Sequence, residues 1–132
     1  MSLSVLVNDV EHTCKEMQKS AEDAAKVWGA AKDLYGGLKE GTYTRDLVIT
    51  KMWECKASIQ TIIDTMVQKM SGLHLLVSGA LTTMRHNGDR EMFLQKVLDP
   101  MMQAQMAGTQ ANGAADMVTQ MILDLVKQQD ET

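Results

Sequence analysis

Histidine and cysteine are the residues of this chain that could bind a metal ion or a haem group. There are three histidines, His12, His74 and His86, and two cysteines, Cys14 and Cys55, in 132 residues. None stands in an HExxH, Cys-x-x-Cys or Glu-x-x-His pattern, so their spacing builds neither a zinc site nor a di-iron site. His12 and Cys14 are two positions apart and would point to different faces of a helix. His74 could ligate haem, but we expect an ordinary solvated or hydrogen-bonded histidine there, and we expect no metal and no cofactor.

The patterns that carry catalysis are also missing from the sequence. Gly36-Gly37 lacks the Gly-Lys-Ser/Thr that a phosphate-binding loop requires, and no Gly-x-Ser-x-Gly motif occurs. Neighbouring acids such as Glu22 and Asp23 fall on a helix face that should be solvated, where they have neither the burial nor the partner that acid–base catalysis requires. The sequence therefore predicts a protein that is not an enzyme.

Methionine is the residue type that most distinguishes the chain. Seven of its twelve methionines lie between Met84 and Met121, and the sixteen residues from Pro100 to Ala115 carry no charge. Methionine side chains are flexible and polarizable, so a methionine-rich helical surface is a candidate site for binding another protein. The alternative is that these methionines fill the core of the protein itself.

Positions 3 to 38 predict a long helix with one buried stripe. Apolar or small residues recur three and four positions apart, a spacing that keeps one side of a helix against a partner helix. A helix over 4–35 would be about 48 Å long, whereas a compact chain of this size is only about 36 Å across. We therefore expect an elongated bundle, or a homo-oligomer that buries the excess length. The stripe consists of Leu3, Val7, Val10, Cys14, Met17, Ala21, Ala24, Trp28, Ala31, Tyr35 and Leu38.

A second helix is predicted over 44–87. Gly36-Gly37 should end the first helix, because glycine readily adopts the left-handed conformation of a helix end. Thr44 should cap the second helix. Its apolar stripe runs from Val48 to Met70, so the two helices should form an αα-hairpin.

Shorter helices are predicted over the rest of the chain, 89–127. Gly72 and Gly79 indicate either a kink or close packing in the second helix, and Asn87-Gly88 should end it. Asp99-Pro100 should start a new helix, because the residue before a proline avoids helical geometry. The expected fold is all-α, a single helical domain over 1–132 that forms an elongated bundle of four to five helices on a long N-terminal αα-hairpin. The short helices expected are 90–98, 101–107, which Gly108 should stop, and one from Asn112 onwards.

Composition excludes several classes of protein. The chain is 45% hydrophobic and 23% charged with a net charge of −4, and it has no basic stripe that would bind nucleic acid. Its longest uncharged apolar run, 70–84, is shorter than the about 20 residues that cross a membrane. Cys14 and Cys55 should be buried and free, since the hairpin would hold them about 16 Å apart, too far for a disulfide. Free cysteines and the absence of a signal peptide favour a soluble protein in the cytoplasm.

These features predict a non-enzymatic helical protein that assembles or binds a protein partner, and a homo-oligomer is expected. A structural subunit or an escort chaperone of a larger complex, such as a secretion apparatus or a virus particle, would fit. The segment from Phe93 to Leu98, followed by a glutamine-rich helix, resembles subunits of bacterial rods and export machines, although we assign the chain to no family. The alternative function is a helical bundle that carries an apolar small ligand. The predicted partner-binding residues are Trp28, Tyr35, Met101, Met102, Met106, Met117 and Met121.

Overall fold

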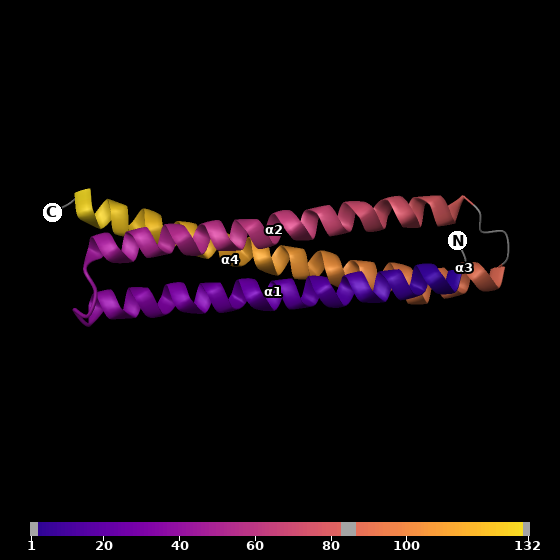
Figure 1. The fold of residues 1–132 in the computed structure, drawn as a ribbon, viewed down its shortest axis with the longest axis horizontal. Helices are drawn as coiled ribbons and strands as arrows, with labels where there is room; N and C mark the ends of the chain where they lie inside the picture. Colours follow the sequence, from indigo (N-terminus) through magenta and orange to yellow (C-terminus); the bar gives the residue numbers. More distant parts are fainter. Residues whose placement is uncertain (1–2, 83–86, 131–132) are drawn as a thin grey trace.

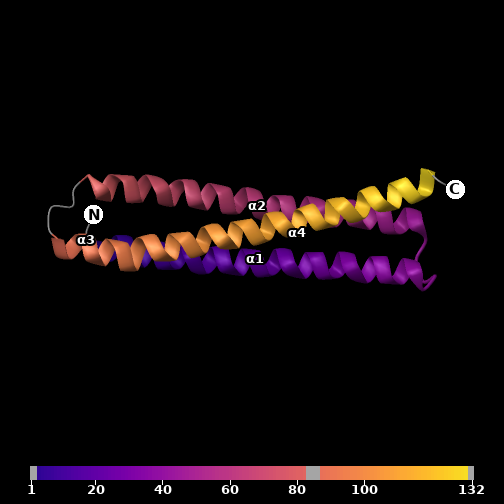
Figure 2. The same cartoon turned by 180° about the vertical axis from the view of Figure 1, so that it is seen from behind.

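Three long helical rods lie side by side in the computed structural model, which describes residues 3–82 and 87–130 (Figure 1). Helices α1 (Leu3–Lys39) and α2 (Arg45–Leu81) run in opposite directions as a hairpin. The third rod consists of α3 (Asn87–Phe93), the π-helical segment η1 (Leu94–Leu98) and α4 (Asp99–Asp130). It runs in the direction of α1, and Figure 2 shows the same order from behind. The all-α class and the long N-terminal hairpin are thus confirmed, whereas the expected four to five helices are corrected to a bundle of three rods.

The turn between α1 and α2 lies later than the sequence predicts. Helix α1 continues through Gly36-Gly37 to Lys39, and the residue with the left-handed conformation is Gly41, at φ +82°. The backbone N–H groups of Thr42 and Tyr43 both donate to the Gly37 carbonyl, with N–O distances of 2.8 and 3.2 Å. A Cβ atom at Gly37 would overlap the ring of Tyr43. Gly37 is therefore needed for close packing inside the turn and does not itself end the helix.

Helix α2 begins where the sequence predicts. Thr44 Oγ1 accepts a hydrogen bond from the backbone N–H of Leu47 at 3.3 Å, so the predicted N-cap is confirmed. The helix runs through Gly72 and Gly79 without a break. It ends at Leu81, before the predicted boundary at 87, and residues 83–86 lie outside the described part of the chain.

The third rod differs most from its prediction. Asn87-Gly88 begins α3 instead of ending α2. Asp99 is the first residue of α4, as predicted, but the π-helical segment η1 leads into α4 without an intervening loop. The backbone N–H of Asp99 donates to the carbonyl of Leu94, and this wider π turn lets the chain pass a proline whose ring would otherwise collide with the preceding turn. Gly108 and Asn112 also lie inside α4, where the Asn112 side-chain amide donates to the Gly108 carbonyl at 3.0 Å. The predicted helix boundaries at Gly108 and Asn112 are wrong because packing along the rod outweighs the local preferences of these residues.

The thiol of Cys14 connects α1 to the third rod beside the π turn. It donates a hydrogen bond to the carbonyl of Pro100 at 3.1 Å. Burial raises the pKa of Cys14, so the thiol keeps the proton that it donates. Cys55 is half-buried, whereas the sequence predicts a buried side chain. Burial, and after it the charge of Glu54, raises the pKa of the Cys55 thiol. Both cysteines are free, as predicted.

The middle of the core is built from alanine on two helices and from larger residues on the third. The predicted stripe of α1 is buried from Val10 to Ala31, except that Trp28 is half-buried. On α2 the buried residues include Ile59 and Ile63, whereas Ile62, which the predicted stripe contains, is half-buried. Small residues facing large ones let the helices approach closely and still fill the space between them. The buried alanines, which we call the alanine layer, are Ala21, Ala24, Ala31, Ala104, Ala107, Ala111, Ala114 and Ala115.

The alanine layer is open to a direct test with two adjacent residues. Ala24 is fully buried and Ala25 is exposed. Ala24→Asp should reduce the free energy of unfolding by about 3 kcal/mol or more, because a carboxylate would be buried without a partner. Ala25→Asp should cost less than about 1 kcal/mol, mainly through helix propensity. Urea unfolding of both variants measures the difference, and equal losses would show that this side of α1 is not packed.

The hairpin turn gives a second pair of neighbouring variants. Gly37→Ala should destabilise the protein by about 1–3 kcal/mol, because the Tyr43 ring must move away. Gly36→Ala should stabilise it by up to about 1 kcal/mol, since a Cβ there meets nothing within 4 Å. Thermal unfolding followed by circular dichroism compares the two. A gain in stability from both substitutions would contradict the packing of Tyr43 on Gly37.

Candidate interaction surface

An exposed ridge along α4 carries three of the predicted methionines. Met102, Met106 and Met117 are 63%, 64% and 51% exposed. They share one side of the helix with Thr109 and Gly113, because these positions recur three and four residues apart. We call these five residues the α4 ridge. No charged residue interrupts it between Pro100 and Ala115, so its surface is apolar or weakly polar along this length.

The other predicted site residues are partly or wholly inside the bundle. Met101 is only 8% exposed and belongs to the core, and Met121 is half-buried against it. Trp28 and Tyr35 are half-buried in the part of α1 that leads to the hairpin turn. Lys32 Nζ lies 5.4 Å from the centre of the Trp28 ring and Lys39 Nζ 4.9 Å from that of Tyr35, distances at which cations are attracted to aromatic faces. The structure therefore places Met102, Met106 and Met117 on one exposed side of α4. Trp28, Tyr35, Met101 and Met121 do not belong to this surface.

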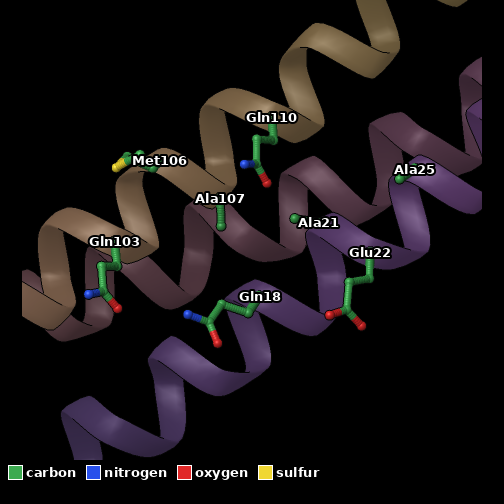
Figure 3. Close-up of a pocket in the computed structure, with 8 residues that line it drawn as sticks. All are labelled: Gln18, Ala21, Glu22, Ala25, Gln103, Met106, Ala107 and Gln110. Atoms are coloured by element: carbon green, nitrogen blue, oxygen red, sulfur yellow. The ribbon is translucent and has the colours of Figure 1, made fainter.

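A shallow groove of about 380 Å³ separates the α4 ridge from α1 (Figure 3). Ala21 of α1 and Ala107 of α4 point toward each other across the gap between the two helices. Polar side chains line its edges, and the carboxylate of Glu22 is the one formal charge among the lining residues. The complete lining is Gln18, Ala21, Glu22, Ala25, Gln103, Met106, Ala107 and Gln110.

A second groove of about 500 Å³ lies on the other side of α4, against α2. Met17, Ile63 and Met66 are the buried residues of its lining, whereas Val67 is 59% exposed. Apart from His74, no ionisable residue lines it. The lining residues, which together with Met102 we call the α2–α4 face, are Met17, Ile63, Met66, Val67, Met70, Ser71, His74, Gln105, Gly108, Thr109 and Asn112.

Charged side chains concentrate on α1, away from the α2–α4 face. Among them Glu16 connects two helices: it pairs with Lys69 of α2, and its Oε1 is 2.6 Å from His12 Nε2. The hydrogen bond from Lys69 is the main cause that lowers the pKa of Glu16, the charges of Lys69 and His12 lower it further, and desolvation opposes them. The remaining charged residues of α1 are Asp9, Glu11, Lys15, Lys19, Glu22, Asp23, Lys26, Lys32, Asp33 and Lys39.

The surfaces described above offer exposed apolar area beside two grooves. Within residues 3–82 and 87–130, no group of three or more His, Cys, Asp and Glu side chains is arranged to hold a metal ion. The raised pKa values of Cys14 and Cys55 disfavour the thiolate that a nucleophilic cysteine needs. What the surfaces offer is exposed apolar area beside shallow grooves, the usual feature of an interaction site.

Comparison with known proteins adds no family to this description. No protein-family model, no curated protein and no solved structure matches the chain. None of the described helices combines the length and the apolar character that crossing a membrane requires.

Sequence reasoning missed the part of the surface that α2 contributes. Val67 and Trp53 are more than half exposed, but neither belongs to the predicted stripe of α2. The available signal was their position next to stripe residues, Val67 after Met66 and Trp53 after Met52. An apolar residue just outside a buried stripe widens the apolar face beyond what a single neighbouring helix covers.

Glu16 gives a prediction about pH. Because its folded pKa is lower than the ordinary value of 4.5, its ion pair stabilises the protein above the unfolded pKa and is lost as pH falls through the folded pKa. Glu16→Gln should therefore lower the Tm at pH 7 and leave it unchanged at a pH below the folded pKa. Glu22→Gln, on the same helix, is the control and should shift the Tm much less at pH 7. A Tm difference for Glu16→Gln that persists in acid would exclude the ion pair as its cause.

Proposed function

We propose that the chain is a non-enzymatic helical assembly or partner-binding protein that contacts another protein through the α4 ridge. The observation that carries this proposal is the exposure of Met102, Met106 and Met117 on one side of α4. Met102 and Met106 lie within the sixteen residues from Pro100 to Ala115 that carry no charge. A structural subunit or an escort chaperone of a larger complex, such as a secretion apparatus or a virus particle, would use such a surface.

Burial of the α4 ridge against another protein should be energetically favourable compared with its exposure to water. Completing the burial of each half-exposed methionine would contribute about 1 kcal/mol, and a mostly uncharged surface can be covered with little desolvation cost. Methionine also adapts its shape to a partner at low cost in strain. A solvated helix face normally carries charged residues instead, as α1 does.

The proposal is tested with the double variant Met102→Lys/Met106→Lys. Both side chains are exposed, so helix content and Tm should stay nearly unchanged. Association should weaken by about tenfold or more, because two ammonium groups would have to lose water in the contact. Native mass spectrometry of the purified protein measures the oligomer, any associated protein chain and any retained small molecule in one experiment.

The control is Leu47→Lys/Leu76→Lys, which places two lysines at exposed apolar positions on α2 outside the second groove. It should leave association unchanged. Unfolding of the Met102/Met106 variant would show that these methionines belong to the core of the subunit. A folded variant with unchanged association would exclude the ridge as the contact.

A carrier of an apolar small ligand is the alternative function, and the second groove favours it to a limited extent. The methionines that line this groove, Met17, Met66 and Met70, would supply an apolar surface, and His74 would supply a polar contact. A carrier normally buries most of its ligand, however, and Val67 and His74 at the rim of this groove are exposed. A small molecule retained in native mass spectrometry would support the carrier over the assembly protein.

A further inference from the structure

We propose that the α2–α4 face binds a second copy of this chain, so that α2 and α4 of two copies form a four-helix layer between them. This inference rests on the proposed function: it specifies that the protein partner is a second copy of the chain and that the contact is made through the α2–α4 face. Figures 1 and 2 show α2 and α4 adjacent along much of the bundle, and the groove between them presents one continuous surface from both helices.

The distribution of charge makes this face compatible with its own copy. Two identical surfaces that meet across a two-fold axis repel one another where they carry like charges. The groove residues of the α2–α4 face carry no formal charge with His74 neutral, whereas α1 carries acidic and basic residues along its length. Lys69, the nearest basic residue of α2, is paired with Glu16 of α1 and is thus held on the α1 side of α2. Self-association through the groove lining itself therefore brings no like formal charges together, and the exposed Asp64 and Asp116 lie just outside that lining.

The exposed surface of the chain is large enough to supply such an interface. The chain exposes 8385 Å², whereas a compact protein of 14.6 kDa would expose about 6,900 Å². The excess of about 1,500 Å² is nearly twice the about 800 Å² that each partner buries in an interface of standard size. One face of the elongated bundle can therefore be covered without using the charged side of α1.

Gly108 leaves room in the groove for the close approach of another chain. Gly108 lies inside α4, where glycine costs about 1 kcal/mol relative to alanine. A Cβ atom there would meet nothing within 4 Å, so packing inside the subunit does not require glycine at this position. A helix of a second copy that packs into the groove could approach α4 more closely at this glycine than at a residue with a side chain. In a two-fold arrangement the α4 ridge of each copy, with Met102 and Met106, can occupy the groove of the other, because ridge and groove lie side by side on α4.

Sedimentation velocity over an about hundredfold range of protein concentration tests the proposal. The wild-type chain should form dimers. Val67→Lys should raise the dimer Kd by about tenfold or more, because the new ammonium must be desolvated in the interface. Leu76→Lys is the matched control: Leu76 is 37% exposed on the same helix, nine positions further on and therefore on its opposite side, and its substitution should leave the Kd unchanged.

A second variant tests close packing at the interface without introducing a charge. Gly108→Ala should raise the Tm at concentrations where the protein is monomeric, because alanine favours the helix, and should also raise the dimer Kd. Gly29→Ala is its control, since Gly29 is an equally open glycine inside α1. It should raise the Tm and leave the Kd unchanged.

Two results would overturn the inference and leave the proposed function standing. The first is a wild-type monomer at every concentration, which would mean that the ridge serves a different protein. The second is a dimer that Val67→Lys and Gly108→Ala do not weaken, which would put the interface elsewhere. The proposed function itself fails on a different result, namely association that Met102→Lys/Met106→Lys leaves unchanged.

Discussion

The close approach of the three helices at the alanine layer is the constraint on which the rest of the structure depends. Between positions 21 and 31 of α1 and 104 and 115 of α4, the buried apolar side chains are all alanine. The larger residues that fill the space come from α2, among them Ile59 and Ile63. A break in the third rod within this layer would separate its alanines and leave cavities around them, which are costly. The third rod therefore continues as helix through Gly108 and Asn112.

The alanine layer also determines which methionines reach the surface. Met101 is in phase with Val97 and Ala104 on the buried side of the rod, whereas Met102 is in phase with Met106 on the outer side. Close packing leaves little room for a long side chain near the layer to turn inward. Adjacent methionines consequently have different roles, one in the core and one on the α4 ridge.

Much of the fold could be predicted from the sequence, because its hydrophobic spacing is regular. The stripe of α1, the hairpin and the Thr44 cap follow from periodicity and capping, which are local properties. The course of the third rod could not be predicted in this way. Rules for Gly108 and Asn112 indicate helix boundaries, but the packing of the alanines overrides them. The π turn that leads into α4 at Asp99 has no local signal in the sequence.

The candidate surface could be predicted only in part for the same reason. The uncharged run and its methionines are visible in the sequence. Whether Met101 or Met102 faces the core can be decided only once the third rod is known to be one continuous helix, because the helix then determines the side on which each residue lies. Val67 joins the surface through the packing of α2 against α4. Contacts between residues so distant in the chain have no signal in local spacing.

The parallel course of α1 and α4 has a mechanical consequence. The start of α1 and the end of α4 lie at opposite ends of the bundle (Figure 1). A force that pulls these two points apart would act along the helix axes and slide α1 against α4. The contacts of the alanine layer would then resist together, whereas a force across the hairpin would open its contacts one after another. The bundle should accordingly withstand tension along its length, which loads the contacts in shear, better than tension across it.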